Sequence, residues 1–497
     1  MINFNLKPTH IFGILLCSIL LSLLLHRPNI STEIRGIHAW RQTQTAWNIR
    51  NFVRHDANIL NPRISHFNTT TKTNLYRYEF PIMQWSIAML QKVVGEHVAV
   101  IRLSIFLIGA FTVIGFFNLL KAIDLDDISA LVGAILFQFS PVFYYYTINP
   151  IPDNLALMGT VWYLYFIMTY FKTSKTKYVI GASLGLLIAT WAKLPFLMFS
   201  IVSIVYFLRQ LFQQKKLDKS LISFTLIQFL ILIPAFAWYA WVMPTWENGV
   251  MKGIFSNQVP WAETKKVIFY HFHTMFPKLL MNYAILIPFF IGLFAMRKHK
   301  TWWLLSIIGI TFLYLGLEFN MISYVHDYYM MPFLPWLYVI VAFGVQAIFN
   351  FKHKAKYFII GGLVIATIFI TNRDIKPFWS IERSYFNPDT FIHSEALRNA
   401  VPDDELCIIY DDLSHYIFSY TIDKMGYVFY SNVLNGAWMD DLIRNKNATY
   451  MYSNNRQVEQ DSLVKLHTDS LILEAGSIRV FKLKTPEQLD EMKNTIE

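Results

Sequence analysis

The sequence predicts a polytopic α-helical membrane protein that ends in a small α/β domain. Only 15% of its 497 residues are charged and 55% are hydrophobic, whereas soluble proteins carry about 25% charged residues. Eleven segments approach the roughly 20 apolar residues that cross a bilayer. A soluble enzyme is therefore excluded, and the 17% aromatic content excludes a disordered chain.

The first predicted span lacks a small-residue cleavage site after its apolar run, so we interpret it as a retained helix. The fifth and sixth spans are short and are separated only by Lys193 and its neighbours, so they could be one. The eleven spans lie at 10–26, 98–120, 129–149, 154–171, 178–193, 196–212, 221–243, 279–296, 302–318, 331–350 and 357–371.

The short loops predict the orientation, because Lys and Arg gather in cytoplasmic loops. With the N-terminus inside, the basic residues of the short loops fall almost entirely on the inner side. These are Lys121, Lys172, Lys175, Lys177, Arg209, Lys215, Lys216, Lys219, Arg297, Lys298, Lys300, Lys352, Lys354 and Lys356. The net charge of +10 is thus mostly a topology signal and needs no nucleic-acid partner.

Three segments then lie outside: a first loop at 27–97, a second loop at 244–278 and a tail at 372–497. We divide the chain into a membrane domain at 1–371 and this tail. Strand-like runs in the tail at 406–410, 426–430, 449–452 and 470–483 predict an α/β domain. The aromatic and histidine residues of the second loop could stack a sugar, cover a site or anchor the loop at the interface; they are Trp246, Trp261, His271 and His273.

The first loop begins with IHAWRQTQTAWNIRNF at 37–52. On a helix His38, Arg41, Gln42 and Thr45 share one face, which predicts an interfacial helix with its apolar side in the membrane. An Arg there can bind a phosphate with two hydrogen bonds. The alternative is an anchor whose polar face contacts only water.

Two carboxylates follow at the same membrane surface. Glu79 lies among aromatics in YRYEFPIMQW, where an apolar setting raises a carboxyl pKa toward the range useful for proton transfer. Asp153 lies in SPVFYYYTINPIPDN, where a helix breaks at prolines and the next begins. A loop acid paired with Arg77 and a helix N-cap are the respective structural alternatives.

Further candidates lie at the outer ends of later spans. YVHDYYMMP at 324–332 offers His326, Tyr328 and Tyr329, although aromatic belts place tyrosines there routinely. Lys193 in TWAKLPF is a cation at an outer end, where it could snorkel or bind an anionic headgroup. No acid, base or Lys lies in the middle of a span, which disfavours a transporter.

The order of HAWRQTQTA, YEFPIMQW, SPVFYY with PIPDN, WYAW at 238–241 and HDYYMMP resembles the bacterial family-39-type membrane glycosyltransferases of the GT-C fold. That group is related to the aminoarabinose transferase and the protein O-mannosyltransferases. The resemblance covers about residues 10–350 and implies a polyprenyl-phosphate sugar donor, an inverting transfer on the outer face of the inner membrane, and a glycan, lipid or protein acceptor.

Carried over by motif, the resemblance assigns Glu79 and Asp153 to acids of the aminoarabinose transferase, and HDYYMMP to a phosphate-contacting entrance. The first loop departs from the pattern, because Gln44 stands where relatives carry an acid. Glu79 is therefore the first candidate base, with His38 and Asp153 next. The predicted substrate contacts are Arg41, Gln42, Gln44, Lys193, His326, Tyr328 and Tyr329.

The sequence predicts no metal site and no certain cofactor. The resemblance leaves a divalent metal open, because some relatives of this fold use one, but no tight cluster of His or carboxylates supports it here. Two cysteines, Cys17 and Cys407, form no framework, and His55, Asp56 and His66 are too loosely spaced for metal ligands. The rival functional class is a flippase, a polysaccharide polymerase or another component of glycan export. A catalytically silent relative is a further alternative.

Overall fold

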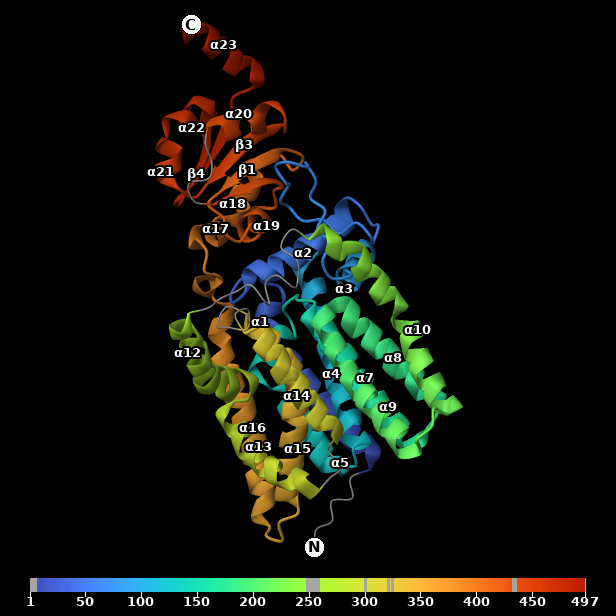
Figure 1. Cartoon of the computed structure of the whole chain (residues 1–497). Coiled ribbons are helices and arrows are strands. Elements are labelled where there is room, and N and C mark those ends of the chain that lie inside the picture. The colour runs from blue at the N-terminus through green and yellow to red at the C-terminus, as the bar shows by residue number, and fades with distance from the viewer. Residues whose placement is uncertain are drawn as a thin grey trace. The chain divides into compact units, whose positions relative to one another are not determined.

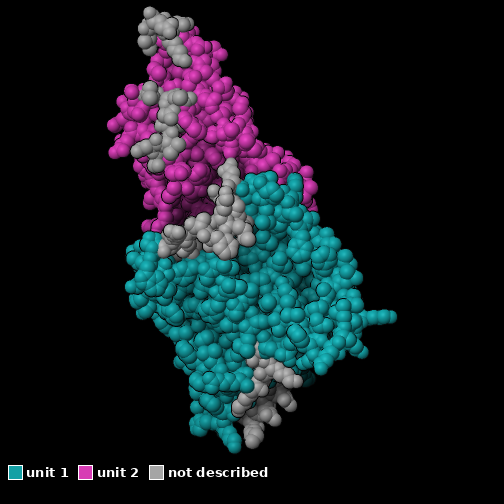
Figure 2. All heavy atoms as spheres, in the orientation of Figure 1, with its two compact units in different colours: residues 1–31, 78–83, 99–377 teal, residues 32–77, 84–98, 378–497 magenta. Residues whose placement is uncertain are grey.

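The computed structural model describes residues 7–246, 260–298, 302–319, 322, 326–430 and 436–496. It contains two compact units, coloured separately in Figure 2. Unit 1 comprises residues 1–31, 78–83 and 99–377, and unit 2 comprises residues 32–77, 84–98 and 378–497. The first predicted outer loop thus packs largely with the tail, and the predicted boundary at 371 lies close to the return of the chain to unit 2.

The regular secondary structure of unit 1 consists of helices in its described residues (Figure 1). Its helices are α1 (Pro8–Ile30), α4 (Val98–Ala122), α5 (Asp127–Gln138), α6 (Pro141–Tyr146), α7 (Asp153–Thr173), α8 (Thr176–Ala192), η1 (Leu194–Ser200), α9 (Ile201–Gln214), α10 (Lys219–Val242), η2 (Met243–Thr245), α12 (Trp261–Tyr270), η3 (His271–Leu280), α13 (Tyr283–Ala295), η4 (Met296–Lys298), α14 (Trp302–Leu317), η5 (Asp327–Phe333), α15 (Leu334–Phe349) and α16 (Ala355–Ile375).

Every predicted span contains a helix of unit 1. Among the described residues, six helices are long and apolar enough to cross a membrane, or seven if the bent pair 261–280 and 283–295 is one span. Helices α5, α8 and α14 are shorter apolar helices. The predicted third span at 129–149 is not one helix, because α5 ends at Gln138 and α6 begins at Pro141, whose ring cannot continue a helix.

Close backbone contacts hold the bundle together at glycines. A Cβ on Gly159 of α7 would lie 2.5 Å from the Gly185 carbonyl oxygen of α8, and a Cβ on Gly292 of α13 would lie 1.9 Å from the Ile340 carbonyl oxygen of α15. Small residues allow such approach where helices pack in membranes. At these two places α7 packs closely against α8, and α13 packs closely against α15.

Unit 2 contains a five-stranded sheet in the order β2-β1-β3-β5-β4. Its strands are β1 (Leu406–Tyr410), β2 (Gly426–Phe429), β3 (Ala448–Ser453), β4 (Thr468–Ala475) and β5 (Ile478–Leu483). Strand β1 pairs in parallel with β2 and β3, and β5 pairs antiparallel with β3 and β4. The predicted strands and hairpin of the tail are confirmed.

The helices of unit 2 come from three parts of the chain. They are α2 (Ala39–Arg54), α3 (Ile82–Val94), η6 (Lys376–Trp379), η7 (Ile381–Ser384), α17 (Pro388–Ile392), α18 (Ser394–Asn399), α19 (Ile417–Ile422), α20 (Gly436–Arg444), α21 (Arg456–Gln460), α22 (Ser462–His467) and α23 (Pro486–Ile496). The first residues of α3 and the first residues of η6 belong to unit 1.

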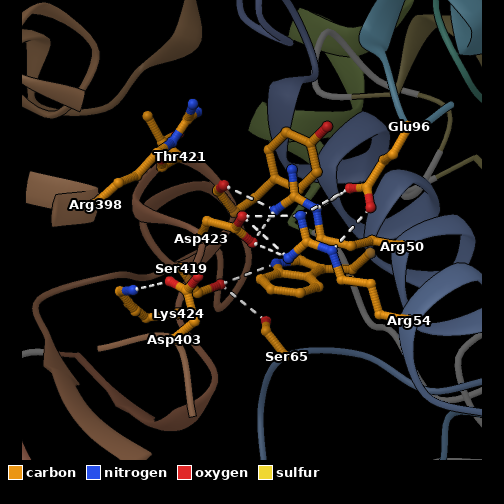
Figure 3. Close-up of polar contacts among 12 residues, drawn as sticks. Arg50, Arg54, Ser65, Glu96, Arg398, Asp403, Ser419, Thr421, Asp423 and Lys424 are labelled. Atoms are coloured by element: carbon orange, nitrogen blue, oxygen red, sulfur yellow. Dashed lines mark hydrogen bonds and ion pairs between the residues drawn. The ribbon is translucent and has the colours of Figure 1, made fainter. Parts of the chain in front are cut away.

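An ionic cluster joins α2 to the tail within unit 2 (Figure 3). Asp423, which follows α19, accepts hydrogen bonds from Arg50 at 2.7 Å and Arg54 at 3.0 Å. Arg54 also pairs with Glu96 at 2.8 Å, and the Arg50 guanidinium lies 4.2 Å from the centre of the Tyr420 ring. The cluster ties the first loop to the C-terminal sheet.

Two histidines, His66 and His415, pack together at the β2 edge of the sheet. The His66 and His415 rings lie 5.1 Å apart, and His66 Nδ1 accepts from the Val428 amide at 3.2 Å. Burial lowers the pKa of His66 to about 4, helped by His415, and burial lowers the pKa of His415 too. The contact therefore requires neutral rings.

We expect acid to loosen this edge. Above pH 6.5 the histidines are neutral in both states, but as pH falls toward 4 the unfolded chain binds protons that the folded chain does not. Buried Cys407 of β1 reports opening. In a Cys17→Ser background, its reaction with a dithiodipyridine should accelerate between pH 7.5 and 5 by up to about 10-fold more than in a His66→Gln variant. A His353→Gln control should behave as wild type, and equal acceleration in all three would contradict the prediction.

Candidate active site

The predicted site residues divide between the two units. Glu79, Asp153, Lys193, His326, Tyr328 and Tyr329 lie in unit 1, whereas His38, Arg41, Gln42 and Gln44 lie in unit 2. The members of unit 1 come from four separate segments of the chain. They form one polar cluster around Lys193, which we call the Lys193 cluster.

Lys193 lies at the end of α8 and pairs with both candidate carboxylates. Its Nζ is 3.3 Å from Glu79 Oε1 and 3.7 Å from Asp153 Oδ2. The side chains are 9%, 17% and 1% exposed for Lys193, Glu79 and Asp153. An ammonium this close stabilises the ionised form of a carboxylate. The aromatic surroundings of Glu79 favour the neutral form, so the two influences oppose each other. Glu79 is not simply a loop acid paired with Arg77.

Aromatic residues cover the same ammonium. Lys193 Nζ lies 4.8 Å from the centre of the Tyr329 ring and 5.9 Å from that of Tyr328, within the range of cation–π attraction. The Tyr328 hydroxyl hydrogen-bonds His326 Nδ1 at 3.2 Å. The HDYYMMP segment therefore lines the Lys193 cluster through η5.

The backbone around Glu79 is fixed from both sides. The Phe80 amide donates to the Trp191 carbonyl at 3.0 Å, and the Trp238 indole N–H donates to the Tyr78 carbonyl at 3.0 Å. The Phe80 ring packs 4.8 Å from Trp191 and 5.0 Å from Trp238. The WYAW segment of α10 thus orients the YEFP segment.

We expect Trp238→Phe to displace Glu79 without unfolding unit 1. Phenylalanine keeps the ring contact with Phe80 but leaves the Tyr78 carbonyl without this donor, a loss worth about 1 kcal/mol. A reaction that depends on the position of Glu79 should slow by roughly 10-fold. Trp241→Phe, on the exposed side of the same helix, is the matched control, and equal activity of both variants would show that the indole does not orient Glu79.

Asp153 is the first residue of α7. It follows a break between α6 and α7 that several side-chain hydrogen bonds stabilise. The buried Arg102 donates to Asn149 Oδ1 at 2.6 Å and to the Ile148 carbonyl at 3.2 Å. The Asn154 side chain donates to the carbonyls of Tyr146 and Asn149, each at 3.0 Å. Pro152 occupies the N-cap position of α7 and Asp153 is the first residue of the helix, so Asp153 is not the N-cap that its structural alternative predicts.

The sequence analysis did not identify two acidic residues near the cluster, Asp327 and Glu318. Asp327 accepts a hydrogen bond from the Tyr146 hydroxyl at 2.7 Å, and both side chains are buried. Glu318 interacts electrostatically with Lys193. The sequence could have indicated both residues as site candidates. Asp327 lies inside the HDYYMMP motif, and Glu318 is an acid at the end of an apolar span.

The polar face of the predicted interfacial helix α2 is buried. Arg41, Gln42 and Gln44 are each 8% exposed or less, so the polar side does not simply contact water. Arg41 donates to Gln44, and the Gln42 amide donates to the Ile37 carbonyl at 2.8 Å. His38 precedes α2 in the left-handed conformation, with φ of 56°.

The second predicted outer loop is described only in part, and residues 247–259 lie outside the described residues. The Trp246 ring stacks on Tyr78 at 5.1 Å. His271 is buried and stacks on Phe319, whereas His273 is exposed and stacks on Phe269. Trp246 therefore contacts the segment that carries Glu79.

Within the part of the chain that the structure describes, no three His, Cys, Asp or Glu side chains form a group that could hold a metal ion. Lys193 occupies the position between Glu79 and Asp153, where its positive charge already balances the carboxylates.

Residues 79–239 match the family model of the dolichyl-phosphate-mannose-protein mannosyltransferases. That segment contains Trp238 and three residues of the Lys193 cluster, Glu79, Asp153 and Lys193, but not the HDYYMMP segment. No curated protein matches the chain significantly by sequence.

Solved structures of similar fold span almost the whole chain. ArnT from Cupriavidus metallidurans bound to undecaprenyl phosphate has a TM-score of 0.69 at 11% identity, covering 95% of this chain and 98% of its own. An oligosaccharyltransferase from Archaeoglobus fulgidus tethered to an acceptor peptide has 0.55 at 12%, covering 94% and 73%. The archaeal oligosaccharyltransferase AglB from the same organism, in complex with an inhibitory peptide and a dolichol-phosphate, has 0.51 at 11%, covering 93% and 72%.

The chain therefore has the fold of the GT-C membrane glycosyltransferases, as its motifs predicted. Within that class, residues 79–239 are similar in sequence to the mannosyltransferase family model.

Proposed function

We propose that the protein is an inverting glycosyltransferase that moves a sugar from a polyprenyl-phosphate donor to a lipid, glycan or protein acceptor. The Lys193 cluster carries the proposal, because it combines a carboxylate base, a buried acid and a cation within one unit. The fold and the match to mannosyltransferases support the same reaction class. We place the reaction on the outer face of a bacterial inner membrane, with the N-terminus in the cytoplasm.

In the proposed reaction the acceptor hydroxyl transfers its proton to the Glu79 carboxylate while its oxygen bonds to the anomeric carbon. The bond from that carbon to the phosphate oxygen breaks, and the polyprenyl phosphate leaves with the electron pair. Attack from the opposite face inverts the configuration and needs no covalent enzyme intermediate. His38 and Asp153 are the alternative bases.

Lys193 is proposed to stabilise the leaving phosphate as well as the carboxylates. An ammonium has three N–H donors, so it can serve Glu79 and Asp153 and still donate to a phosphate oxygen. Fixed charges placed where negative charge develops are effective in a site that excludes water. Tyr328, Tyr329 and His326 are proposed to line the donor position, and Arg41, Gln42 and Gln44 stay predicted substrate contacts.

The test compares a strain that lacks the protein with one that expresses it. Mass spectrometry of its lipids and glycans should show one sugar-bearing product that disappears on deletion and returns with the wild-type gene. Return of the product with an Asp153→Asn, Glu79→Gln double variant of normal abundance would contradict the proposed site. Movement of a lipid-linked glycan across proteoliposomes without a new glycosidic bond would instead identify a flippase.

A further inference from the structure

Residues 261–280 form a helical arm, α12 continued by η3, that leaves the bundle at a steep angle. Its axis meets that of α13 at 99° after a break of two residues. Helix α13 is the apolar half of this pair and lies within a predicted span. If α13 crosses the membrane, an arm at right angles to it runs along the membrane plane.

Hydrogen bonds fix the bend itself. The Leu280 carbonyl, at the end of the arm, accepts from the Ser140 hydroxyl at 2.8 Å and the Tyr338 hydroxyl at 2.9 Å. Asn282 caps α13 through the Ala284 amide at 3.1 Å and donates to the Thr371 hydroxyl at 3.0 Å. These side chains are buried, so hydrogen bonds inside unit 1 fix the angle between the arm and α13.

The arm presents one face to the bundle and another away from it. The inner face repeats at helical spacing and is buried, with Val267, His271, Met275 and Leu279. The outer face is aromatic: Trp261 is 64% exposed, Phe269 61% and Phe272 73%. Large exposed apolar patches mark interaction sites on protein surfaces, and these three aromatics gather on one face of one short arm.

Basic residues border this aromatic face. Lys265, Lys266 and Lys278 are exposed, and against them stands Glu263, which pairs with Lys266 at 2.6 Å. Lys265 Nζ lies 5.4 Å from the centre of the Trp261 ring. An aromatic face with a basic border suits the boundary between headgroups and acyl chains of an anionic membrane.

We propose that the arm at 261–280 lies in the headgroup layer, inserts Trp261, Phe269 and Phe272 among the acyl chains, and binds anionic phospholipid through Lys265 and Lys266. The arm packs against η5 and α6, so it occupies the end of unit 1 that carries the Lys193 cluster. This lipid-binding role is independent of the proposed reaction.

The depth of the arm can be measured with a fluorescent label. A Phe272→Cys variant, in a Cys17→Ser background, is labelled with NBD and reconstituted into phosphatidylcholine and phosphatidylglycerol nanodiscs. NBD emission should be quenched more by lipid spin-labelled at carbon 5 than at carbon 12. Two control positions bracket the result: Phe111→Cys in the middle of α4, 56% exposed, and Leu413→Cys in unit 2, 76% exposed.

The two controls show the quenching expected of a label deep in the bilayer and of a label in water. Label at 111 should be quenched more strongly by the carbon-12 probe, and label at 413 by neither probe. A label at 272 that behaves like either control would overturn the interfacial position of the arm, since it would then be deep in the bilayer or in water.

Lipid charge is tested with the same label. At equal mole fraction, spin-labelled phosphatidylglycerol should quench NBD at 272 at least about 2-fold more than spin-labelled phosphatidylcholine, because each lysine near a surface favours anionic lipid by about 5-fold. A Lys265→Gln, Lys266→Gln variant should lose this preference, whereas a Lys215→Gln, Lys216→Gln control should keep it. Equal quenching by both lipids in the unmodified arm would overturn the anionic-lipid site.

Discussion

Replacing Glu79 by glutamine is expected to lower sugar transfer by about 10²- to 10⁴-fold, the usual contribution of a positioned base. Glutamine has nearly the same shape, and its Oε1 can still accept a hydrogen bond from Lys193, which lies 3.3 Å away in the wild type. The backbone bonds of Tyr78 and Phe80 do not involve the side chain. The loss should therefore appear in the rate of transfer and not in the folding of unit 1.

The measurement is transfer of labelled sugar from the native lipid-linked donor by purified protein. Binding of undecaprenyl phosphate, measured in parallel, should change far less than the rate, because the carboxamide replaces a base and not a phosphate contact. Glu395→Gln, an exposed acid of α18 in unit 2, is the matched control for the loss of one carboxylate. If Glu79→Gln retains full activity, the same assay on His38→Gln and Asp153→Asn decides between the remaining candidates.

Much of the fold was accessible to sequence reasoning because membrane spans and strands are local patterns. Twenty apolar residues or an alternating run indicate an element without knowledge of its partners. The bend at residues 280–282 and the break at 139–152 depend instead on long-range bonds. Examples are Ser140 to Leu280 and Arg102 to Asn149.

In the candidate site, too, local sequence indicated the single residues but not the long-range contacts between them. Lys193 was conspicuous because a cation at that end of a span is unusual, and Glu79 and Asp153 stood out by their surroundings. Their pairing was not predictable, since Glu79 and Lys193 are 114 residues apart and nothing local specifies the contact. The sequence suggested a headgroup as the partner of Lys193, and the structure adds two carboxylates.

Helix α2 shows what a helical pattern alone leaves out. Its polar residues share a face, which predicts exposure to water or to headgroups. In the structure Asn48 donates to the Arg63 carbonyl at 2.6 Å, and Arg50 binds Asp423. A polar face can be buried when later parts of the chain supply its hydrogen bonds.

Replacing Lys193 by methionine is expected to destabilise unit 1 by about 3–5 kcal/mol. The substitution leaves Glu79 and the 1%-exposed Asp153 without their shared cation, and removal of one partner from a buried ion pair carries this cost because the remaining charge is uncompensated. Thermal unfolding of the purified protein, followed by loss of its monodisperse elution peak, should shift to lower temperature. Lys172→Met breaks the exposed pair with Asp124 and should cost less than about 1 kcal/mol.

A second substitution separates charge from packing. If uncompensated charge is the cause, Asp153→Asn in the Lys193→Met background removes a buried negative charge, and the double variant should be more stable than Lys193→Met alone. The coupling between the two sites should fall in the range of about 0.5–3 kcal/mol that residues in contact show. Additive losses would mean that Lys193 acts through the packing of its stem against Tyr328 and Tyr329, and not through the carboxylates. Because the same ammonium is proposed to stabilise the leaving phosphate, transfer should stay low in the double variant even where its stability recovers.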